Sequence, residues 1–448
     1  MLSSMTKSKA LFLFKFKAFS LVIAFFLSFS LIGCGGGGDS SSSNNSPDIT
    51  YSVSFYDENL DLIEAIPVEQ GNIDIADIKL GVWYKASENT PLATLNLNSD
   101  TALYAVANIV EITSQDELAF IKNNSATLEG KYILLNDIPL NENGAGFEDT
   151  LGWIPIGNNL YRFTGIFNGN GHKITNLWIN RQSDYHIGLF GFANNAQIKN
   201  LGVEIAEGKS ISGYSHVGGI VGYASNVNII NSYSKGNING NDYVGGIVGN
   251  ADYTNMANSY STGNINGEWY IGGIAGEVSD TNMANSYSKV NINGNRYIGG
   301  IVGEAQYSNI INVYSTGNIN GNYYYIGGIA GDIVSSSNIS NSVAINSPVI
   351  GRGSGPVNRV VGYIYSGIVS NNFALDIMVG GENYNGLANS FSYSGDIRYH
   401  GIGRSIEELK TRNTYETGLG WKFGDNDTAP WKIDSNKNNG LPYFYWQD

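Results

Sequence analysis

The sequence predicts an all-β protein whose main part is a right-handed parallel β-helix with rungs of about 27 residues. A phrase of the form Gly-Gly-Ile-Val-Gly or Gly-Gly-Ile-Ala-Gly recurs, and its glycine pairs are 27, 27, 27 and 28 residues apart. Each repeat holds three short β-type segments separated by Gly, Asn, Asp and Ser, and none has the 3.6-residue apolar period of a helix. The phrase begins at Gly218, Gly245, Gly272, Gly299 and Gly327.

A 27-residue repeat is too short for a propeller blade, which needs roughly 40 to 45 residues, but it fits one rung of a solenoid. Stacked rungs would align equivalent residues about 4.8 Å apart. We therefore expect two isoleucine columns, an asparagine column, and a tyrosine column that ends at Val343. In order, these are Ile220, Ile247, Ile274, Ile301 and Ile329; Ile238, Ile265, Ile292 and Ile319; Asn231, Asn258, Asn285, Asn312 and Asn341; and Tyr233, Tyr260, Tyr287 and Tyr314.

The repeat resembles the GLUG motif family, which occurs in tandem on bacterial surface proteins and in regions attached to IgA-specific peptidases. The matching words are "YVGGIVGNA" and "NMANSYSTGNING", and flanking segments such as "GKYILLNDIPL" and "FTGIFNGNGHKITNL" are similar as well. The resemblance covers residues 111–448 and implies the β-helical fold for residues 111–390. It implies no single activity.

Residues 1–33 are typical of a signal peptide. Four lysines precede an apolar run that is too short to span a bilayer comfortably. The run ends in Leu31-Ile32-Gly33-Cys34, which resembles the lipobox of bacterial lipoproteins and implies a lipid on Cys34 that holds the chain to a membrane. The alternative is an incidental cysteine in an uncleaved signal anchor. Because residue 36 is Gly rather than Asp, the resemblance implies the outer membrane and the cell surface.

Two short regions follow the cysteine. Residues 34–48 are rich in Gly, Ser and Asn, which predicts a flexible tether. Residues 49–110 alternate short strands with turns, which predicts a separate small domain. Their words "LNLNSDTALYAVA" resemble the internalin B-type repeat, which implies a small β-grasp-like module that acts as a stalk or spacer, but Asn108 stands where that family commonly has tryptophan.

Both ends of the β-helix are predicted to be capped, because an open stack would expose unpaired strand edges. Ser114 and Glu117 form a capping-box pattern that opens a short helix. Irregular first rungs over residues 130–210 would have a core of bulky side chains. These are Trp153, Phe163, Phe167, Trp178, Phe190 and Phe192.

Residues 391–448 are predicted to form the C-terminal cap, with a helix over residues 406–411. An aromatic group in this region reads as a plug for the end of the stack, and an exposed row of rings for sugar stacking is the alternative. The group comprises Trp421, Trp431, Tyr443 and Trp446.

The charge balance argues against a nucleic-acid partner. The chain has 25 basic and 39 acidic residues, a net charge of −14, and an acidic surface repels phosphate backbones. Only 14% of residues are charged, against about 25% in typical domains. Asn, Ser, Tyr and Gly would then form much of the surface, which suits hydrogen bonding and ring stacking with glycans.

No strong catalytic pattern stands out, and no metal or cofactor is predicted. His172, His186, His216 and His400 all lie outside any His-Glu-x-x-His motif, so a zinc peptidase would lack its ligands. His216 replaces a tyrosine in the column of Tyr243, Tyr270, Tyr297 and Tyr325, and we expect it to stack there. The segment that begins at Asp434 reads as a turn rather than a calcium loop, because its glycine comes one position late.

A catalytic β-helix would need converging groups on one outer face. Glu268, Glu277 and Glu304 look scattered along the repeats, and Lys289 and Arg296 look isolated. The sequence therefore favours a protein that is not an enzyme.

One variable column suggests a binding surface. Its residues precede each Tyr-x-Gly-Gly and change chemistry in every rung, while their neighbours stay nearly constant, so we expect the column to face solvent. The column comprises Ser215, Asp242, Trp269, Arg296 and Tyr324. Trp269, Arg296, Tyr323 and Tyr324 would lie within about 10 Å of one another as a contact strip. An ordinary variable surface edge is the alternative.

Three functions are compatible with these patterns. The first is a lipid-anchored surface adhesin or binding module whose partner is a glycan or a protein on another surface. The second is a polysaccharide lyase or hydrolase of the β-helix type, and the third is a structural scaffold.

Overall fold

The computed structural model describes residues 50–448, apart from residues 76–78, 80–82, 90, 93, 98, 122–124, 353–354, 379 and 383–395. The chain divides into two compact units, residues 1–48 and 49–448. The predicted signal peptide, Cys34 and the tether lie outside the described residues, and what was expected of them stays a prediction.

The second unit begins with a small mixed sheet. β1 (Thr50–Tyr56) pairs antiparallel with β2 (Leu62–Glu69) and parallel with β5 (Thr101–Tyr104), and β3 (Gly71–Asp74) pairs antiparallel with β4 (Thr94–Leu97). A core of its own includes Phe55 and Trp83, whose rings meet edge to face at 4.8 Å.

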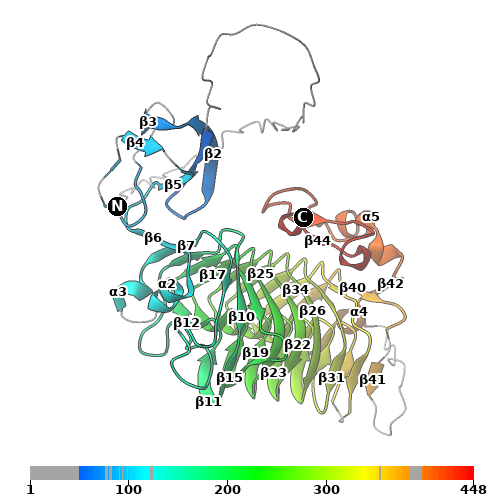
Figure 1. Cartoon of the computed structure of the whole chain (residues 1–448). Coiled ribbons are helices and arrows are strands. Elements are labelled where there is room, and N and C mark those ends of the chain that lie inside the picture. The colour runs from blue at the N-terminus through cyan, green and yellow to red at the C-terminus, as the bar shows by residue number, and fades with distance from the viewer. Residues whose placement is uncertain are drawn as a thin grey trace, which may run out of the picture. The chain divides into compact units, whose positions relative to one another are not determined.

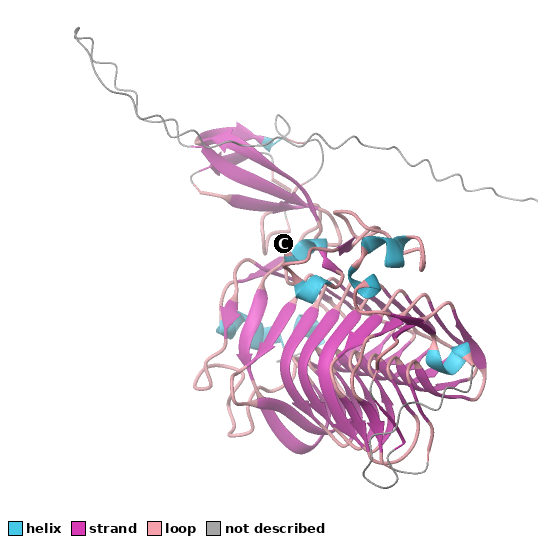
Figure 2. Cartoon of the chain, turned by 90° about the vertical axis from the view of Figure 1, so that its right-hand side faces the viewer, coloured by secondary structure: helices cyan, strands magenta, loops and turns pink. Residues whose placement is uncertain are grey.

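The rest of the unit is a parallel β-solenoid (Figure 1). Figure 2 shows the strands of successive rungs lying side by side in long rows. The first row is a seven-stranded sheet of β12 (Phe190–Asn194), β16 (Val221–Ser225), β20 (Val248–Asp252), β24 (Ala275–Ser279), β28 (Val302–Gln306), β33 (Ala330–Val334) and β38 (Val361–Ile364).

The second row has ten strands and starts where the chain leaves the small domain. Its strands are β6 (Ile109–Ile112), β7 (Lys131–Leu134), β9 (Ile166–Asn168), β13 (Gln197–Lys199), β17 (Asn228–Ile230), β21 (Asn255–Ala257), β25 (Asn282–Ala284), β29 (Asn309–Ile311), β34 (Ser337–Ser340) and β39 (Gly367–Ser370).

The third sheet takes two strands from most rungs. Its strands are β8 (Ile138–Pro139), β10 (Lys173–Leu177), β11 (Ile179–Ile187), β14 (Gly202–Ile205), β15 (Ser210–Gly218), β18 (Tyr233–Asn239), β19 (Asp242–Gly245), β22 (Tyr260–Asn266), β23 (Trp269–Gly272), β26 (Tyr287–Gly294), β27 (Arg296–Gly299), β30 (Tyr314–Thr316), β31 (Ile319–Gly321), β32 (Ile326–Gly327), β35 (Val343–Ala344), β36 (Val349–Gly351), β37 (Val357–Asn358), β40 (Phe373–Leu375), β41 (Gly380–Glu382) and β42 (Ile402–Arg404).

The predicted columns are confirmed, because neighbouring rungs pair in parallel with equivalent residues opposite each other. Every isoleucine of the two predicted columns is buried, with at most 2% of its surface exposed. Burial of one such side chain contributes about 1.5–3 kcal/mol. A single rung cannot bury its apolar side alone, so this stabilisation depends on the neighbouring rungs.

The glycine phrase marks a fold-back between two strands whose backbones touch. A Cβ added to Gly245 would lie 2.0 Å from the carbonyl oxygen of Val248, and one added to Gly249 would lie 2.5 Å from the carbonyl carbon of His216. Real Cβ atoms do not come this close to backbone. The repeat therefore keeps glycine where β19 meets β20 and where β20 meets β15 of the preceding rung.

The asparagine column occupies a turn in the left-handed region, which asparagine tolerates better than most residues. Asn231, Asn258 and Asn312 have φ values of 50°, 52° and 55°. Their side chains form a ladder in which Asn258 Nδ2 donates to Asn231 Oδ1 at 3.1 Å. The amide column thus joins successive rungs through side-chain hydrogen bonds.

At the N-terminal end, the predicted capping box and helix are confirmed by α2 (Gln115–Phe120), which is followed by α3 (Ser125–Leu128). Ser114 Oγ accepts from the Glu117 amide at 3.4 Å, and Glu117 Oε2 accepts from the Ser114 amide at 3.1 Å. Of the six predicted core aromatics, five are buried and Trp178 is half-buried.

The C-terminal region differs from the expectation in two respects. The helix expected over residues 406–411 is a short 3-10 turn, η2 (Glu408–Lys410), followed by α5 (Arg412–Glu416). Thr411 separates them because its backbone is extended, with φ −110° and ψ 134°. The remaining elements are α4 (Ile397–His400), β43 (Trp431–Lys432), η3 (Asn438–Gly440), β44 (Tyr443–Phe444) and η4 (Tyr445–Gln447).

The second difference is where the aromatic group packs. It does form a core, with Trp421 and Trp431 fully buried, but it covers the side of the stack, so the expectation of an end plug is wrong. The end is instead covered by β42, which pairs with β40, and by α4, which packs against β38.

The surface beneath the aromatic group is the column of Tyr233, Tyr260, Tyr287 and Tyr314, here called the flank ladder. Its successive rings are stacked at 5.0, 4.9 and 4.8 Å. Trp431 packs on Tyr314 at 6.0 Å, and Trp446 packs on Tyr260 at 5.7 Å. The C-terminal segment therefore runs back toward earlier rungs and shields the ladder from water.

Candidate binding face and pocket

The four residues of the predicted contact strip meet around one guanidinium group. The Cζ atom of Arg296 lies 4.5 Å from the ring centre of Trp269, 5.2 Å from Tyr323 and 5.1 Å from Tyr324. Tyr323 and Tyr324 are 47% and 37% exposed, while Trp269 and Arg296 are half-buried. These four residues are called the Arg296 cluster below.

The variable column that contains this cluster is aligned as predicted, but it does not face solvent along its whole length. Ser215, Asp242, Trp269 and Arg296 pair in consecutive rungs. Ser215 is only 3% exposed, and its hydroxyl lies 3.1 Å from Nδ1 of His216. The expectation of an exposed column is therefore wrong for Ser215, whose side chain is buried beside that of His216.

A second aromatic stack, the outer ladder, lies beside the Arg296 cluster and consists of His216, Tyr243, Tyr270, Tyr297 and Tyr325. Successive ring centres are 4.8, 4.9, 4.6 and 5.4 Å apart. His216 is stacked on Tyr243 with 15° between the ring planes, which confirms its predicted role as a stacking substitute. Trp269 lies 6.1 Å from Tyr297, so the outer ladder and the Arg296 cluster form one continuous aromatic face.

Burial keeps His216 uncharged near neutral pH. Loss of solvent, followed by the nearby charge of His186, lowers its pKa to about 4. The two rings lie 5.1 Å apart. His172 instead lies against Asp137, and His400 is buried near the C-terminal end, so the structure does not bring the four histidines together.

The acidic residues of the repeats are not all scattered, which corrects the sequence-based expectation. Glu277, Glu304 and Asp332 pair in three successive rungs and form a carboxylate column, which Asn250 continues as an amide in the rung before. Gln306 Nε2 donates to Glu277 Oε1 at 3.0 Å and to Glu304 Oε1 at 2.7 Å. Each member directly follows a Gly-Gly-Ile-Val-Gly or Gly-Gly-Ile-Ala-Gly phrase, and this position is the signal that could have revealed the column.

The surroundings of this column favour protonated carboxyl groups. Burial, and then the charges of Glu304 and Asp252, raises the pKa of Glu277 to about 7. Burial, and then Glu304, raises the pKa of Asp332 to about 7. Burial, and then the charges of Glu277, Asp242 and Glu304, raises the pKa of Tyr243 to about 12. A protonated carboxyl group can donate a hydrogen bond or a proton, as a general acid does.

In the described ranges, no group of three or more His, Cys, Asp or Glu side chains is placed to hold a metal ion. The segment at Asp434 is a turn, as expected. Asp434 Oδ1 accepts from the Asn436 amide at 2.8 Å, and the Asp434 carbonyl accepts from the Lys437 amide at 3.1 Å. These bonds close the loop on itself.

Lys289 is not isolated, since its Nζ donates to Asn438 Oδ1 at 2.8 Å and ties the C-terminal segment to the stack. Sequence reasoning missed this contact because Asn438 belongs to the non-repeating segment.

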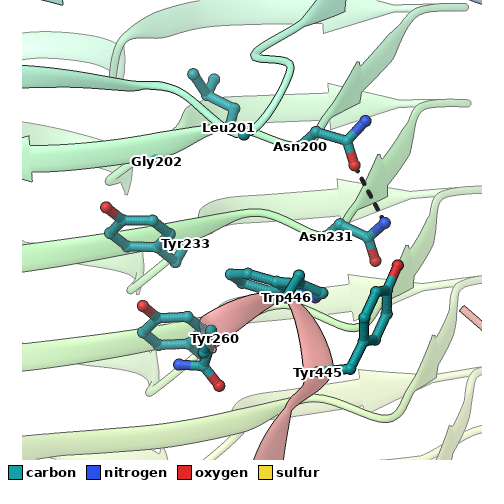
Figure 3. Close-up of a pocket in the computed structure, with 10 residues that line it drawn as sticks. Asn200, Leu201, Gly202, Asn231, Tyr233, Tyr260, Tyr445 and Trp446 are labelled. Atoms are coloured by element: carbon teal, nitrogen blue, oxygen red, sulfur yellow. Dashed lines mark hydrogen bonds between the residues drawn. The ribbon is translucent and has the colours of Figure 1, made fainter. Parts of the chain in front are cut away.

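A pocket of about 460 Å³ lies where the flank ladder ends (Figure 3). It is framed by the amide side chains of Asn200 and Asn231 and by the rings of Tyr233, Tyr445 and Trp446. Sequence reasoning missed this pocket, because the C-terminal segment that forms one wall has no repeat to reveal its position.

Comparison with known proteins places GLUG motifs in the chain at residues 213–239, 240–266 and 294–320. Each match is one rung long and lies among the regular rungs. The class defined by fold and motif is thus a parallel β-solenoid that contains GLUG repeats.

Two curated relatives are similar over short stretches. A Gly-rich membrane protein of Evansella cellulosilytica is 51% identical over 51 residues, 11% of this chain. Halomucin of Haloquadratum walsbyi is 36% identical over 121 residues, 25% of this chain. The chain spans only 6% and 1% of the lengths of these two proteins.

Two solved structures are also similar. One is described as an immunoglobulin A1 protease from Bacteroides ovatus, with 21% identity, a TM-score of 0.48, and coverage of 76% of this chain and 93% of that one. Another, described as an IgA1 protease, has 20% identity, a TM-score of 0.45, and coverage of 65% of this chain and 23% of that one. In the part of the chain that the structure describes, no helix is both long and apolar enough to cross a membrane.

Proposed function

We propose that this protein is a cell-surface binding module that adheres to glycans through the Arg296 cluster and the outer ladder. The observation that carries the proposal is the Arg296 guanidinium held 4.5 Å from Trp269 beside two exposed tyrosines. Trp, Tyr and Arg are the residues most enriched at binding hot spots.

The chemistry of the face suits a sugar chain. Exposed rings offer flat apolar surface to the C–H face of a pyranose ring, and the Arg296 guanidinium donates hydrogen bonds toward hydroxyl or carboxylate oxygens. Tyr323 and Tyr324 extend the same surface beyond Trp269 and Arg296, so several consecutive sugar rings could be held at once.

A surface location fits this role. The lipobox-like Cys34 would anchor the protein to the outer membrane, and residues 49–110 would act as an internalin B-type stalk. The name of the Evansella relative, a membrane protein, agrees with such a location.

The test is a glycan array probed with residues 49–448, which form one compact unit. Trp269→Ala combined with Tyr324→Ala should weaken binding about tenfold or more, about 1.4 kcal/mol. Tyr253→Ala is the matched control, because Tyr253 is 63% exposed and has no part in the cluster. Unchanged binding by the double variant, or equal loss in the control, would overturn the proposal.

A second candidate, cleavage of a polysaccharide, is favoured by the carboxylate column. Glycoside hydrolysis uses two carboxyl groups, one of them protonated at the working pH, and Glu277 has a pKa raised to about 7 beside Glu304 in the next rung. Incubation of polysaccharides with the protein and with Glu277→Gln would test it by counting new reducing or unsaturated ends. Absence of new ends from the unaltered protein would remove this candidate.

A further inference from the structure

The pocket in Figure 3 lies where the flank ladder ends, next to Tyr233. Tyr233 is the first tyrosine of that ladder, and the residue paired with it in the preceding rung is Gly202. Gly202 has no side chain, so the space above it holds only the outer ring atoms of Tyr233, which would lie 2.6 Å from an added Cβ. The C-terminal segment then closes one side of this space with Trp446.

The aromatic part of the pocket forms a platform. Trp446 is nearly parallel to Tyr260, with 26° between the planes at 5.7 Å, and to Tyr233, with 21° at 6.5 Å. A cage for a quaternary ammonium group would need rings that surround the cation on several sides. Parallel rings instead suit a flat ligand that stacks on them.

The polar part of the pocket offers acceptors. Asn231 Nδ2 donates to Asn200 Oδ1 at 3.1 Å and to Asp427 Oδ1 at 2.9 Å, so its hydrogens are used. The amide oxygens of Asn200 and Asn231 each accept one bond from the neighbouring rung and keep a second lone pair. A ligand rich in hydroxyl donors would satisfy these oxygens.

The charges around the pocket disfavour an anion. Its ten lining residues include no basic or acidic side chain. The carboxylate of Glu204 lies just outside, 3.1 Å from the Tyr233 hydroxyl and 3.2 Å from Lys173 Nζ. A phosphate, a sulfate or a uronic acid would find no cation among the lining side chains. The volume of about 460 Å³ falls within the range of small-ligand sites.

We propose that this pocket binds a single neutral pyranose ring, such as the end of a saccharide chain, stacked on Trp446 and hydrogen-bonded to Asn200 and Asn231. The site lies on the flank of the stack and shares no residue with the Arg296 cluster. The test of this pocket is therefore independent of the test of the proposed binding face.

The repeat itself supplies the variant that tests this site. Gly202→Tyr would continue the flank ladder and fill the pocket with the residue that the next four rungs carry. The backbone of Gly202 is outside the left-handed region, and an added Cβ would meet only the outer ring atoms of Tyr233, the nearest at 2.6 Å. That flexible ring can shift as the side chain enters.

The measurement is saturation-transfer NMR of methyl hexopyranosides and methyl N-acetylhexosaminides with the full-length chain in detergent micelles. We expect saturation of ring protons by the unaltered protein, and a loss of roughly tenfold or more in affinity with Gly202→Tyr. Thermal unfolding of the variant verifies that it is folded. In parallel, binding should quench tryptophan fluorescence, and Trp446→Phe should remove that signal while keeping a ring for stacking.

Two controls separate this proposal from the other site. Trp269→Ala should leave saturation transfer unchanged, because Trp269 belongs to the Arg296 cluster. Tetramethylammonium should not compete with the glycosides. The proposal is overturned if no neutral glycoside binds, if folded Gly202→Tyr binds as well as the unaltered protein, or if tetramethylammonium displaces the sugar.

Discussion

Trp446 and Tyr260 lie 5.7 Å apart with 26° between their ring planes, although Tyr260 belongs to a regular rung and Trp446 to the non-repeating C-terminal segment. This contact shows that the C-terminal segment belongs to the hydrophobic core of the stack. The segment covers a ladder of tyrosines that would otherwise face water.

Removal of a ring from this segment should therefore destabilise the whole solenoid. Trp431 is fully buried and contacts Tyr287, Tyr314 and Trp421, so Trp431→Ala should lower the free energy of unfolding by roughly 3–5 kcal/mol. Urea unfolding followed by circular dichroism measures it. Tyr365→Ala, at a side chain that is 76% exposed, should change stability by less than about 0.5 kcal/mol. Equal effects would show that the segment is not part of the core.

The carboxylate column should make stability depend on pH. Because burial raises the pKa of Glu277 from 4.5 to about 7, the folded state holds a proton between these values that the unfolded state has released. The contribution of Glu277 to stability is therefore lost as the pH rises through this window. Asp332, with a pKa raised to about 7, acts in the same sense.

His216 changes stability in the opposite direction as the pH rises, because its pKa is lowered to about 4. The effect of Glu277 alone is therefore obtained by comparing the stability of the variant with that of the parent protein at each pH. The stability of Glu277→Gln relative to the parent should increase from about pH 5 to about pH 8. Urea unfolding at these two pH values gives the difference. A difference that stays constant with pH would mean that Glu277 is not buried beside other acids.

The contact between β20 and β15 of the preceding rung should tolerate no side chain. A Cβ on Gly249 would lie 2.5 Å from the backbone of His216, so Gly249→Ala should cost about 3 kcal/mol through overpacking. Gly403→Ala is the matched control, because the nearest atom to its Cβ would be 3.4 Å away. Thermal unfolding compares the two, and similar midpoints would contradict the close approach of the strands.

The left-handed turn at Asn258 predicts a particular order of variants. Asn258 has φ 52°, which costs alanine about 1–2 kcal/mol and glycine nothing. Both variants lose the side-chain bonds to Asn231 and Asp427. Asn258→Ala should therefore be less stable than Asn258→Gly by about 1 kcal/mol. The reverse order in urea unfolding would show that Asn258 does not have a left-handed backbone conformation.

The repeat made much of this fold predictable. Equal spacing fixes which residues stack, so the isoleucine, asparagine and tyrosine columns and the stacking of His216 follow from counting. The Arg296 cluster could also be predicted from the sequence, because comparison of the rungs shows the one position whose residue type changes from rung to rung. Periodicity does not tell how deeply a column is covered, and for that reason Ser215 was expected to be exposed.

Two features were missed for different physical reasons. The acidic residues fall at one fixed position after the glycine phrase, but their raised pKa values depend on burial, which spacing does not reveal. The C-terminal segment has no repeat of its own, so its aromatic residues indicate a buried cluster without indicating which surface it covers. The pocket beside Trp446 depends on that placement.

The C-terminal segment also determines how many rungs lie beneath it. Its rings reach from Tyr314 back to Tyr233 and so span four rungs. A tandem array can usually gain or lose a rung by unequal recombination, since each new copy only needs a matching neighbour. Here the spanning segment fixes the number of rungs that it covers. Deletion of one rung between Tyr233 and Tyr314 would shift its rings by one rung relative to the tyrosines they cover.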